Sequence, residues 1–261
     1  MVTTVYLVRH GETEGSEVKR YKGSVDVPLS ENGAEQIRRA AVFIRRHLKD
    51  AAPSRHLSYL KDVHGDAGGP TDADYGLSAV YCSPLSRALK SAEIIAGPYG
   101  LAPIVLPDLR ERSFGAWENM TFSEIKEKYP EEFAAWASNP LRFSPVGGEN
   151  TLEVRDRVVR ALDDIMGDHA IAQEGTVPDL PTVGGSPRTK QGGVVESGLS
   201  PTSSDIAVVA HGGVNRVILC HIMGVPLENI FRIEQDFAAV NIIEFWDKYP
   251  VVKLVNGGPN G

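Results

Sequence analysis

Val5-Tyr6-Leu7-Val8-Arg9-His10-Gly11-Glu12-Thr13 is the most informative stretch of the chain. Its apolar, β-favouring residues predict a buried strand over residues 3–9, and the strand ends in a cation and an imidazole. Ligands of α/β proteins bind outside the carboxyl ends of the strands. A histidine can attack phosphorus, and a neighbouring guanidinium can hold phosphoryl oxygens in its planar fork. The stretch therefore suggests phosphoryl transfer through a phosphohistidine.

Two further segments repeat this arrangement of an apolar strand followed by Gly, Ser or Pro and then by polar residues. Leu77 to Cys82 predicts a short strand that leads into Ser83-Pro84-Leu85-Ser86-Arg87-Ala88. Asp205 to Ala210 predicts a buried strand that leads into His211-Gly212-Gly213. Because parallel strands bring their carboxyl ends to one edge of a sheet, we expect the polar residues of all three segments to lie together.

This edge would carry Arg9, His10, Arg87 and His211, a set that suits a phosphoryl group. Two guanidiniums can each make paired hydrogen bonds to its oxygens and neutralise charge in the transition state. One imidazole would attack in line while the other stabilises an equatorial oxygen. The helix that begins near Gly212 would direct backbone N–H groups toward the anion. Each residue alone has an ordinary structural explanation, so the joint occurrence carries the prediction.

Cleavage of a phosphate ester also requires a proton for the leaving oxygen. Glu111 follows a short strand predicted at Pro103 to Leu106 and is the best candidate for this acid. It would protonate the leaving oxygen first and then deprotonate the water that hydrolyses the phosphohistidine.

Strands alternate with amphipathic helices along most of the chain. This order predicts an α/β fold, a three-layer sandwich with a mostly parallel sheet flanked by helices. Ser30 and Thr151 are the expected N-caps of two of these helices. The helices are predicted at 30–49, 84–97, 121–138 with a break at Pro130, 150–167 and 213–223, and a last strand at 240–246.

Residues 1–250 are expected to form a single domain, followed by a tail at 251–261. Two stretches rich in Gly, Pro, Ser and Asp, at about 51–77 and about 168–204, are predicted to be insertions. A helical excursion at about 108–150 is expected to roof the site.

The composition is that of an ordinary globular protein, with 42% hydrophobic and 23% charged residues. A formal net charge of −7 argues against a nucleic-acid partner, and the absence of an 18-residue apolar run argues against a membrane span. No signal peptide is recognisable, and Cys82 and Cys220 lie in apolar surroundings without metal-ligand spacing. These observations predict a cytoplasmic protein with two buried thiols.

The motifs resemble those of the histidine phosphatase superfamily, the phosphoglycerate-mutase-like proteins. Arg9-His10-Gly11-Glu12-Thr13 is similar to the opening signature of that family, and the segment from Gly23 to Gly33 to its next one. Ser83-Pro84-Leu85-Ser86-Arg87-Ala88 and Ala210-His211-Gly212-Gly213 are similar to the second and third motifs. All of them occur in the order of the family, from residue 3 to about residue 246.

The resemblance implies a nucleophilic His10, a phosphate pocket made by Arg9, Arg87 and His211, and an acid at Glu111. It also implies no metal and no organic cofactor, and a homodimer is common among relatives. The chain departs from the family at Gly15-Ser16, where many members carry Trp-Asn. Ser16 can still donate one hydrogen bond to phosphate, with less reach than Asn.

Within the family, the segment from Glu111 to Glu118 and Pro145-Val146-Gly147-Gly148-Glu149-Asn150 resemble the phosphatase branch, which includes broad-specificity and alpha-ribazole phosphatases. A mutase retains a bisphosphate while it reorients and so requires additional cations. The roof segment 118–150 is acidic instead, which disfavours a second phosphate site. It sets Lys126, Lys128 and Arg142 against Glu118, Glu124, Glu127, Glu131, Glu132 and Glu149.

Three hypotheses follow from the sequence. The leading one is a metal-independent phosphomonoesterase, a histidine acid-type phosphatase acting on a small phosphorylated metabolite. The second is a bisphosphate-dependent phosphoglycerate mutase, which the motif order supports and the acidic roof opposes. The third is a non-catalytic phosphate-binding module on the same fold, which Ser16 and the insertions leave open.

Overall fold

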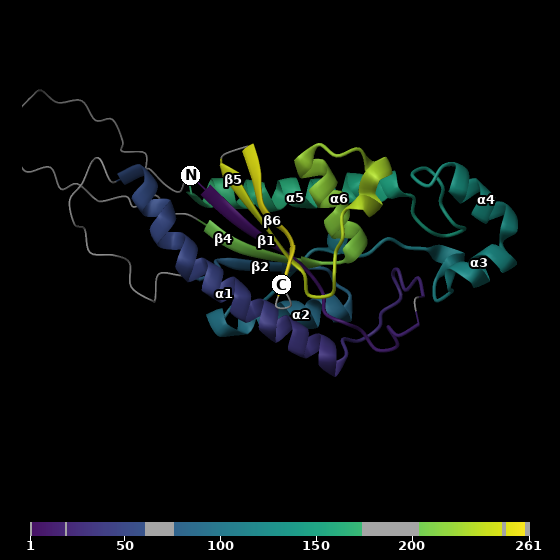
Figure 1. Ribbon diagram of the computed structural model, residues 1–261, viewed down its shortest axis with the longest axis horizontal. Helices are drawn as coiled ribbons and strands as arrows, with labels where there is room; N and C mark the ends of the chain where they lie inside the picture. The colour runs from purple at the N-terminus through teal and green to yellow at the C-terminus, as the bar shows by residue number, and fades with distance from the viewer. Residues whose placement is uncertain (1, 19, 61–75, 174–203, 247–248, 259–261) are drawn as a thin grey trace, which may run out of the picture.

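The centre of the protein is a mixed β-sheet (Figure 1). The computed structural model describes residues 2–18, 20–60, 76–173, 204–246 and 249–258, and within these ranges the sheet has six strands in the order β3-β2-β4-β1-β5-β6. Strands β1 to β4 make only parallel pairs with one another. β5 pairs antiparallel with β1, and β6 pairs antiparallel with β5. The strands are β1 Val2–Arg9, β2 Ala79–Cys82, β3 Ile104–Val105, β4 Ser204–Ala210, β5 Val240–Trp246 and β6 Tyr249–Gly257.

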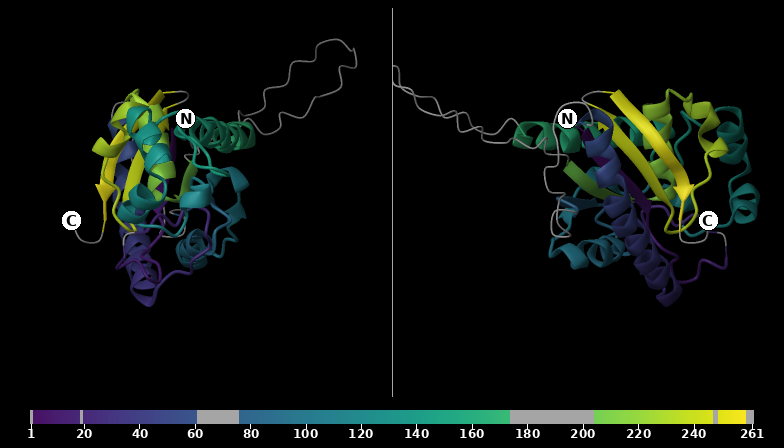
Figure 2. Two further views of the ribbon diagram at one scale, coloured as in Figure 1. Left: turned by 90° about the vertical axis from the view of Figure 1, so that its right-hand side faces the viewer. Right: turned by 60° about the vertical axis from the view of Figure 1, so that its left-hand side comes forward.

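Helices cover both faces of the sheet (Figures 1 and 2). α1 (Glu31–Leu60) and α2 (Ser86–Ala96) cover one face, and α5 (Thr151–Gln173) and α6 (Gly212–Met223) the other. The shorter helices α3 (Phe122–Lys128) and α4 (Pro130–Ser138) lie beyond the sheet, at the end toward which β1 points. No helix within the described residues is long and apolar enough to cross a membrane.

The alternation of side chains along β1 explains the three layers. Val5 and Leu7 belong to the core cluster that includes α5 and α6, whereas Tyr6 and Val8 belong to the cluster with α1 and α2. Successive side chains of a strand point to opposite faces, so an apolar run without alternation buries both faces. The predicted sandwich is confirmed, and β1 lies at its centre between β4 and β5.

The predicted start of α1 is confirmed, because the Ser30 hydroxyl accepts a hydrogen bond from the backbone N–H of Gly33 at 3.0 Å. A Cβ on Gly33 would overlap the carbonyl oxygen of Glu12, so a glycine is needed where this helix packs against the segment after β1. The expected cap of α5 was wrong by one residue. Asn150 Oδ1 accepts from the N–H groups of Leu152 and Glu153 at 2.9 and 3.0 Å, and Thr151 is the first helical residue.

Three predicted boundaries were also wrong. Residues 51–60, expected in an insertion, continue α1, and residues 168–173 continue α5, while the rest of both insertions, at 61–75 and 174–203, lies outside the described residues. The expected tail from 251 belongs largely to β6. None of the residues of β6 is fully buried, and Val252 and Leu254 pack against opposite core clusters across an irregularity in the pairing with β5, so its apolar pattern is weak.

Candidate active site

The carboxyl ends of β1, β2 and β4 converge on one cavity of about 720 Å³. Its lining includes the predicted site residues Arg9, His10, Ser16, Arg87, Glu111 and Gly212. His211 lies directly behind, with no exposed surface, and its ring centroid is 5.1 Å from that of His10. The structure therefore brings together side chains that the sequence places up to about two hundred residues apart, as parallel pairing of the three strands requires.

His10 is oriented by a hydrogen bond to the main chain. Its Nδ1 lies 2.7 Å from the carbonyl oxygen of Gly11, and because a carbonyl can only accept, Nδ1 carries the proton. The other ring nitrogen, Nε2, then holds the free lone pair. Burial, followed by the charges of Arg9 and Arg87, lowers the pKa of His10 well below its usual value. The ring is thus a neutral imidazole, which is the nucleophilic form.

His211 is held in a complementary way by Ser83, the residue that follows β2. The Ser83 hydroxyl lies 2.7 Å from His211 Nε2 and also accepts the N–H of Leu85 at 3.3 Å. Burial, followed by the charge of a protonated His10, lowers the pKa of His211 well below its usual value. If the Ser83 hydroxyl donates to Nε2 of this neutral ring, Nδ1 carries the proton and can donate to a ligand.

Arg87 is anchored by two carbonyl oxygens, and only 3% of it is exposed. Its Nη1 donates to Val25 at 2.8 Å and its Nη2 to Gly23 at 2.7 Å. Each terminal nitrogen of a guanidinium carries two hydrogens, so one donor of each remains for a ligand. The segment from Gly23 to Gly33, which the sequence singled out without a role, thus holds a cation in place.

Arg9 is the last residue of β1 and donates from Nη1 to the carbonyl oxygen of Gln235 at 2.5 Å. Its guanidinium carbon lies 4.0 Å from the centre of the Phe237 ring, a cation–π contact. Burial lowers the pKa of Arg9 to about 10, which still leaves it charged at neutral pH. Phe237 lies in the loop before β5, where no sequence pattern marked it.

Unsatisfied polar atoms mark the place of a ligand. Among the described residues, four buried side-chain polar atoms lack a hydrogen-bond partner, and two of them are Arg9 Nε and His211 Nδ1. Buried polar groups without partners are costly, so an unpartnered pair in one place is a sign of a missing ligand. Both donors belong to the cluster around His10, where they would suit the oxygens of an anion.

Glu111 reaches the same cavity from the segment after β3. Its carboxylate accepts the backbone N–H of Gly213, at the start of α6, at 3.1 Å, and that of Arg112 at 3.0 Å. A Cβ on Gly213 would lie 2.5 Å from Glu111 Oε1, so the approach depends on a glycine at this position. The carboxylate is therefore fixed between two backbone donors at the cavity wall.

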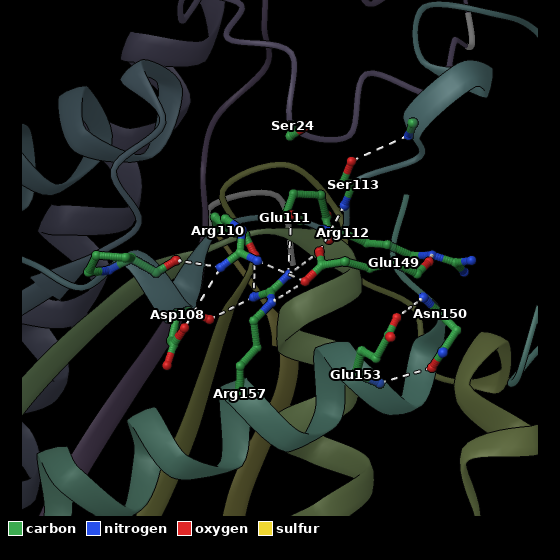
Figure 3. A network of polar contacts seen from close by, with 12 residues as sticks. Ser24, Asp108, Arg110, Glu111, Arg112, Ser113, Glu149, Asn150, Glu153 and Arg157 are labelled. Atoms are coloured by element: carbon green, nitrogen blue, oxygen red, sulfur yellow. Dashed lines mark hydrogen bonds and ion pairs between the residues drawn. The ribbon is translucent and has the colours of Figure 1, made fainter. Parts of the chain in front are cut away.

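A buried ion pair supports the segment that carries Glu111 (Figure 3). Arg157, on α5 and 4% exposed, binds both oxygens of Glu149 at 2.8 and 2.9 Å. It also donates to the carbonyl oxygens of Asp108 and Arg110 at 2.7 and 2.8 Å, and to that of Glu111 at 3.3 Å. One guanidinium thus holds three carbonyl groups of the backbone that positions Glu111.

Lys22 is a cavity-lining residue that the sequence reasoning missed. Its ammonium donates to Thr13 Oγ1 at 3.2 Å and to the carbonyl oxygen of Glu14. Burial, followed by the charge of Arg87, lowers its pKa. Ser16 also lines the cavity. Its backbone N–H donates to the carbonyl oxygen of Thr13 at 3.2 Å, so Ser16 lies on the turn to which the Lys22 ammonium bonds. The sequence did offer one signal for this residue, because Lys22 directly precedes the segment from Gly23 to Gly33.

The roof differs from the acidic surface that its composition suggested. Glu118 accepts the Ser24 hydroxyl at 2.5 Å, Glu132 accepts the Trp117 indole N–H at 3.1 Å, and Glu124 pairs with Arg20 at 2.7 Å. Of the acidic residues in the described chain, only Glu111 lines the cavity. These roof carboxylates therefore bind donors within the fold, and they do not set the charge of the cavity.

Neither metal ligation nor a disulfide is visible in the described parts of the chain. They contain no group of three or more His, Cys, Asp or Glu side chains that could hold a metal ion. Cys82 and Cys220 are buried free thiols, as predicted, and burial raises the pKa of Cys82 to about 11. A thiol that remains protonated in this way is inert packing material.

Comparison with known proteins gives a consistent result. The profile of the histidine phosphatase superfamily (branch 1) matches residues 5–61, 69–173 and 193–257. Bifunctional protein Rv2228c of Mycobacterium tuberculosis is 29% identical over 97% of this chain, which spans 54% of that relative, about half its length. Phosphoserine phosphatase 1 of Hydrogenobacter thermophilus is 26% identical over 96% of this chain and 90% of its own.

The crystal structure of the alpha-ribazole phosphatase from Shigella flexneri has the same fold. It superposes with a TM-score of 0.68 at 20% identity and covers 98% of this chain and 96% of its own.

Proposed function

The chain belongs to the histidine phosphatase superfamily, and we propose that it is a metal-independent phosphomonoesterase acting on a small phosphorylated metabolite. In this proposal His10 accepts the phosphoryl group and water removes it. Relatives named as phosphatases of small metabolites support the reaction class. The observation that carries the proposal is the neutral His10, with Nε2 free, between two buried arginines and beside a carboxyl group.

In the first step, His10 Nε2 attacks phosphorus in line and the ester P–O bond breaks. Arg9, Arg87 and the Nδ1–H of His211 hold the phosphoryl oxygens and neutralise their charge. The backbone N–H of Gly212, in the first turn of α6, would add a donor from the cavity wall. Glu111, in its protonated form, gives its proton to the leaving alkoxide, so the alcohol departs neutral.

In the second step, Glu111 takes a proton from a water molecule, and the oxygen of that water attacks the phosphorus of the phosphohistidine. The P–N bond breaks, the lone pair returns to Nε2, and inorganic phosphate leaves. We further propose that Lys22 supplies the donor that Ser16 is too short to provide. The Lys22 ammonium bonds to the turn that carries Ser16, and both residues line the cavity. Hydrolysis then needs only groups of the chain and water.

The proposal is tested by phosphate release from p-nitrophenyl phosphate. The variant His10→Ala should lose activity by at least about 10³-fold, because the covalent route depends on this one side chain. His221→Ala, an exposed histidine of α6, is the matched control and should retain wild-type turnover. Full turnover by His10→Ala contradicts the proposal, as does bisphosphate-dependent interconversion of phosphoglycerates that is faster than phosphate release.

A further inference from the structure

The outer half of the cavity is lined by aromatic and aliphatic side chains. They come from the segment after β3, from α3 and α4, and from the 3₁₀ turn at 227–232. Aromatic side chains bury large apolar areas and offer flat faces to a ligand. The members that matter here are Phe114, Phe122, Ile125, Phe133, Trp136 and Phe231.

Ile125 is buried, but two of the other side chains are far more exposed than core residues. Phe231 is 77% exposed and Phe122 is 46% exposed, although both are large and apolar. Phe122, Phe133 and Trp136 form a mutual cluster, with ring centroids 4.8 Å apart for the first pair and 5.5 Å for the last. None of the residues of α4 is buried. An exposed apolar patch inside a cavity is typical of a binding site for an apolar group.

The cations near this outer half are already engaged within the protein. Arg20 makes a two-pronged bond to Glu124 at 2.7 and 3.1 Å. Arg112 donates to the carbonyl oxygens of Glu149 and Phe143 at 2.7 and 3.1 Å. Arg216 lies on the phosphate side instead, since its Nη1 would be 3.4 Å from a Cβ on Gly212. Arg20 is thus neutralised by Glu124, while the hydrogen bonds of Arg112 to carbonyl oxygens hold its guanidinium in place.

We infer that the preferred substrate is a phosphomonoester of a large, apolar alcohol, whose apolar part binds under α3 and α4. The inference rests on the proposed function for the position of the phosphate. It sets this chain apart from a relative named for phosphoserine, whose leaving group is small and charged. The binding free energy from apolar contact increases with the apolar area that is buried, and it does not depend on a single partner atom.

A series of n-alkyl phosphates tests the inference, because lengthening the chain adds apolar area while the leaving-group pKa stays nearly constant. We expect kcat/KM to rise by up to about fourfold per added methylene while the chain remains under the roof. Phosphoserine should be a poorer substrate than butyl phosphate. In Phe231→Ala the rise per methylene should be smaller, and in Trp136→Ala smaller still. Val42→Ala, an exposed apolar residue of α1, is the matched control and should keep the full rise.

Binding of the corresponding alkylphosphonates, measured by calorimetry, separates this inference from the proposed function. Affinity that rises with chain length supports the inference even if no ester is hydrolysed, an outcome that would overturn only the phosphatase proposal. Hydrolysis at rates independent of chain length, with phosphoserine as good a substrate, overturns the inference and leaves the phosphatase proposal standing. Phosphonate affinity that stays flat with chain length also overturns it.

Discussion

A single hydrogen bond decides which nitrogen of His10 can attack. The Gly11 carbonyl fixes the proton on Nδ1, so the lone pair on Nε2 is available. Burial and two guanidiniums then keep the ring neutral. The sequence predicted His10, Arg9, Arg87 and His211 because each directly follows a recognisable strand or opens a helix. It could not predict the tautomer, because that depends on where a carbonyl oxygen lies in space.

The lowered pKa values of His10 and His211 have a consequence for stability. Below about pH 6.5 the unfolded chain protonates both rings while the folded chain does not, so the free energy of unfolding falls as the pH falls. The slope should be up to about 1.4 kcal/mol per pH unit for each ring. The double variant His10→Gln, His211→Gln should show a shallower slope in urea unfolding between about pH 6.5 and pH 5. Equal slopes for the two proteins would contradict the burial of neutral rings.

The role of Glu111 as an acid can be tested by changing the leaving group. Glu111→Gln keeps one of the two oxygens that accept the N–H groups of Gly213 and Arg112, but it removes the transferable proton. The loss in kcat/KM should be about 10²- to 10⁴-fold for phenyl phosphate and clearly smaller for p-nitrophenyl phosphate, whose phenolate leaves without help. The same loss for both esters would show that Glu111 supplies no proton to the leaving oxygen.

At the level of elements, the segment from Arg110 to Ser113 has no helix or strand to stiffen it, and α5 takes over that role. Arg157 joins this segment to Glu149 through five hydrogen bonds (Figure 3). Burial raises the pKa of Glu149, but the hydrogen bonds from Arg157 and Ser113 and the charges of Arg157 and Arg110 together lower it, so it remains the anionic partner. A helix placed over the sheet thus determines where the acid can reach.

Removing Arg157 should therefore damage both the fold and the reaction. Arg157→Met leaves the largely buried Glu149 with Arg110 as its remaining charged partner, which should cost up to about 3 kcal/mol in the free energy of unfolding. Arg155→Met is the matched control, because Arg155 lies two residues away on α5 and its ion pair with Asp156 is exposed. Loss of that ion pair should change the free energy of unfolding by less than about 0.5 kcal/mol.

Kinetics distinguish positioning from stability alone. In the folded Arg157→Met variant, the loss of activity should be larger for phenyl phosphate than for p-nitrophenyl phosphate, because displacement of Glu111 affects the poorer leaving group more. Equal losses for the two esters would leave Arg157 with a purely structural role.

The elements that were predicted well are those with strong periodicity or clear caps. β1, β4, α2 and α6 match the expected ranges to within about two residues, and Pro130 begins α4 as expected. The continuation of α1 to Leu60 and the strand β6 were missed. None of the residues of β6 is fully buried, and its apolar residues meet β5 through an irregular antiparallel pairing that its own sequence does not encode.

At the scale of the whole molecule, charge is distributed unevenly. The chain carries a net charge of −7, yet six arginines and lysines and a single carboxylate line the cavity. The roof illustrates the limit of reading charge from composition. Its acidic composition was expected to disfavour a second phosphate site, but Glu118 and Glu132 bond to Ser24 and Trp117 and do not line the cavity, whereas aromatic residues do. Net charge does not reveal which side of a segment lines a site.

The central claim is that the phosphoryl group passes through His10, and rapid quenching of the enzyme with a radiolabelled phosphomonoester tests it most directly. We expect acid-labile label on the protein within one turnover, located by peptide mapping to His10, absent in His10→Ala and present in His221→Ala. In Glu111→Gln the label should persist longer, because the water that removes it lacks its base. Turnover without any labelled protein, or label on a residue other than His10, would contradict the account.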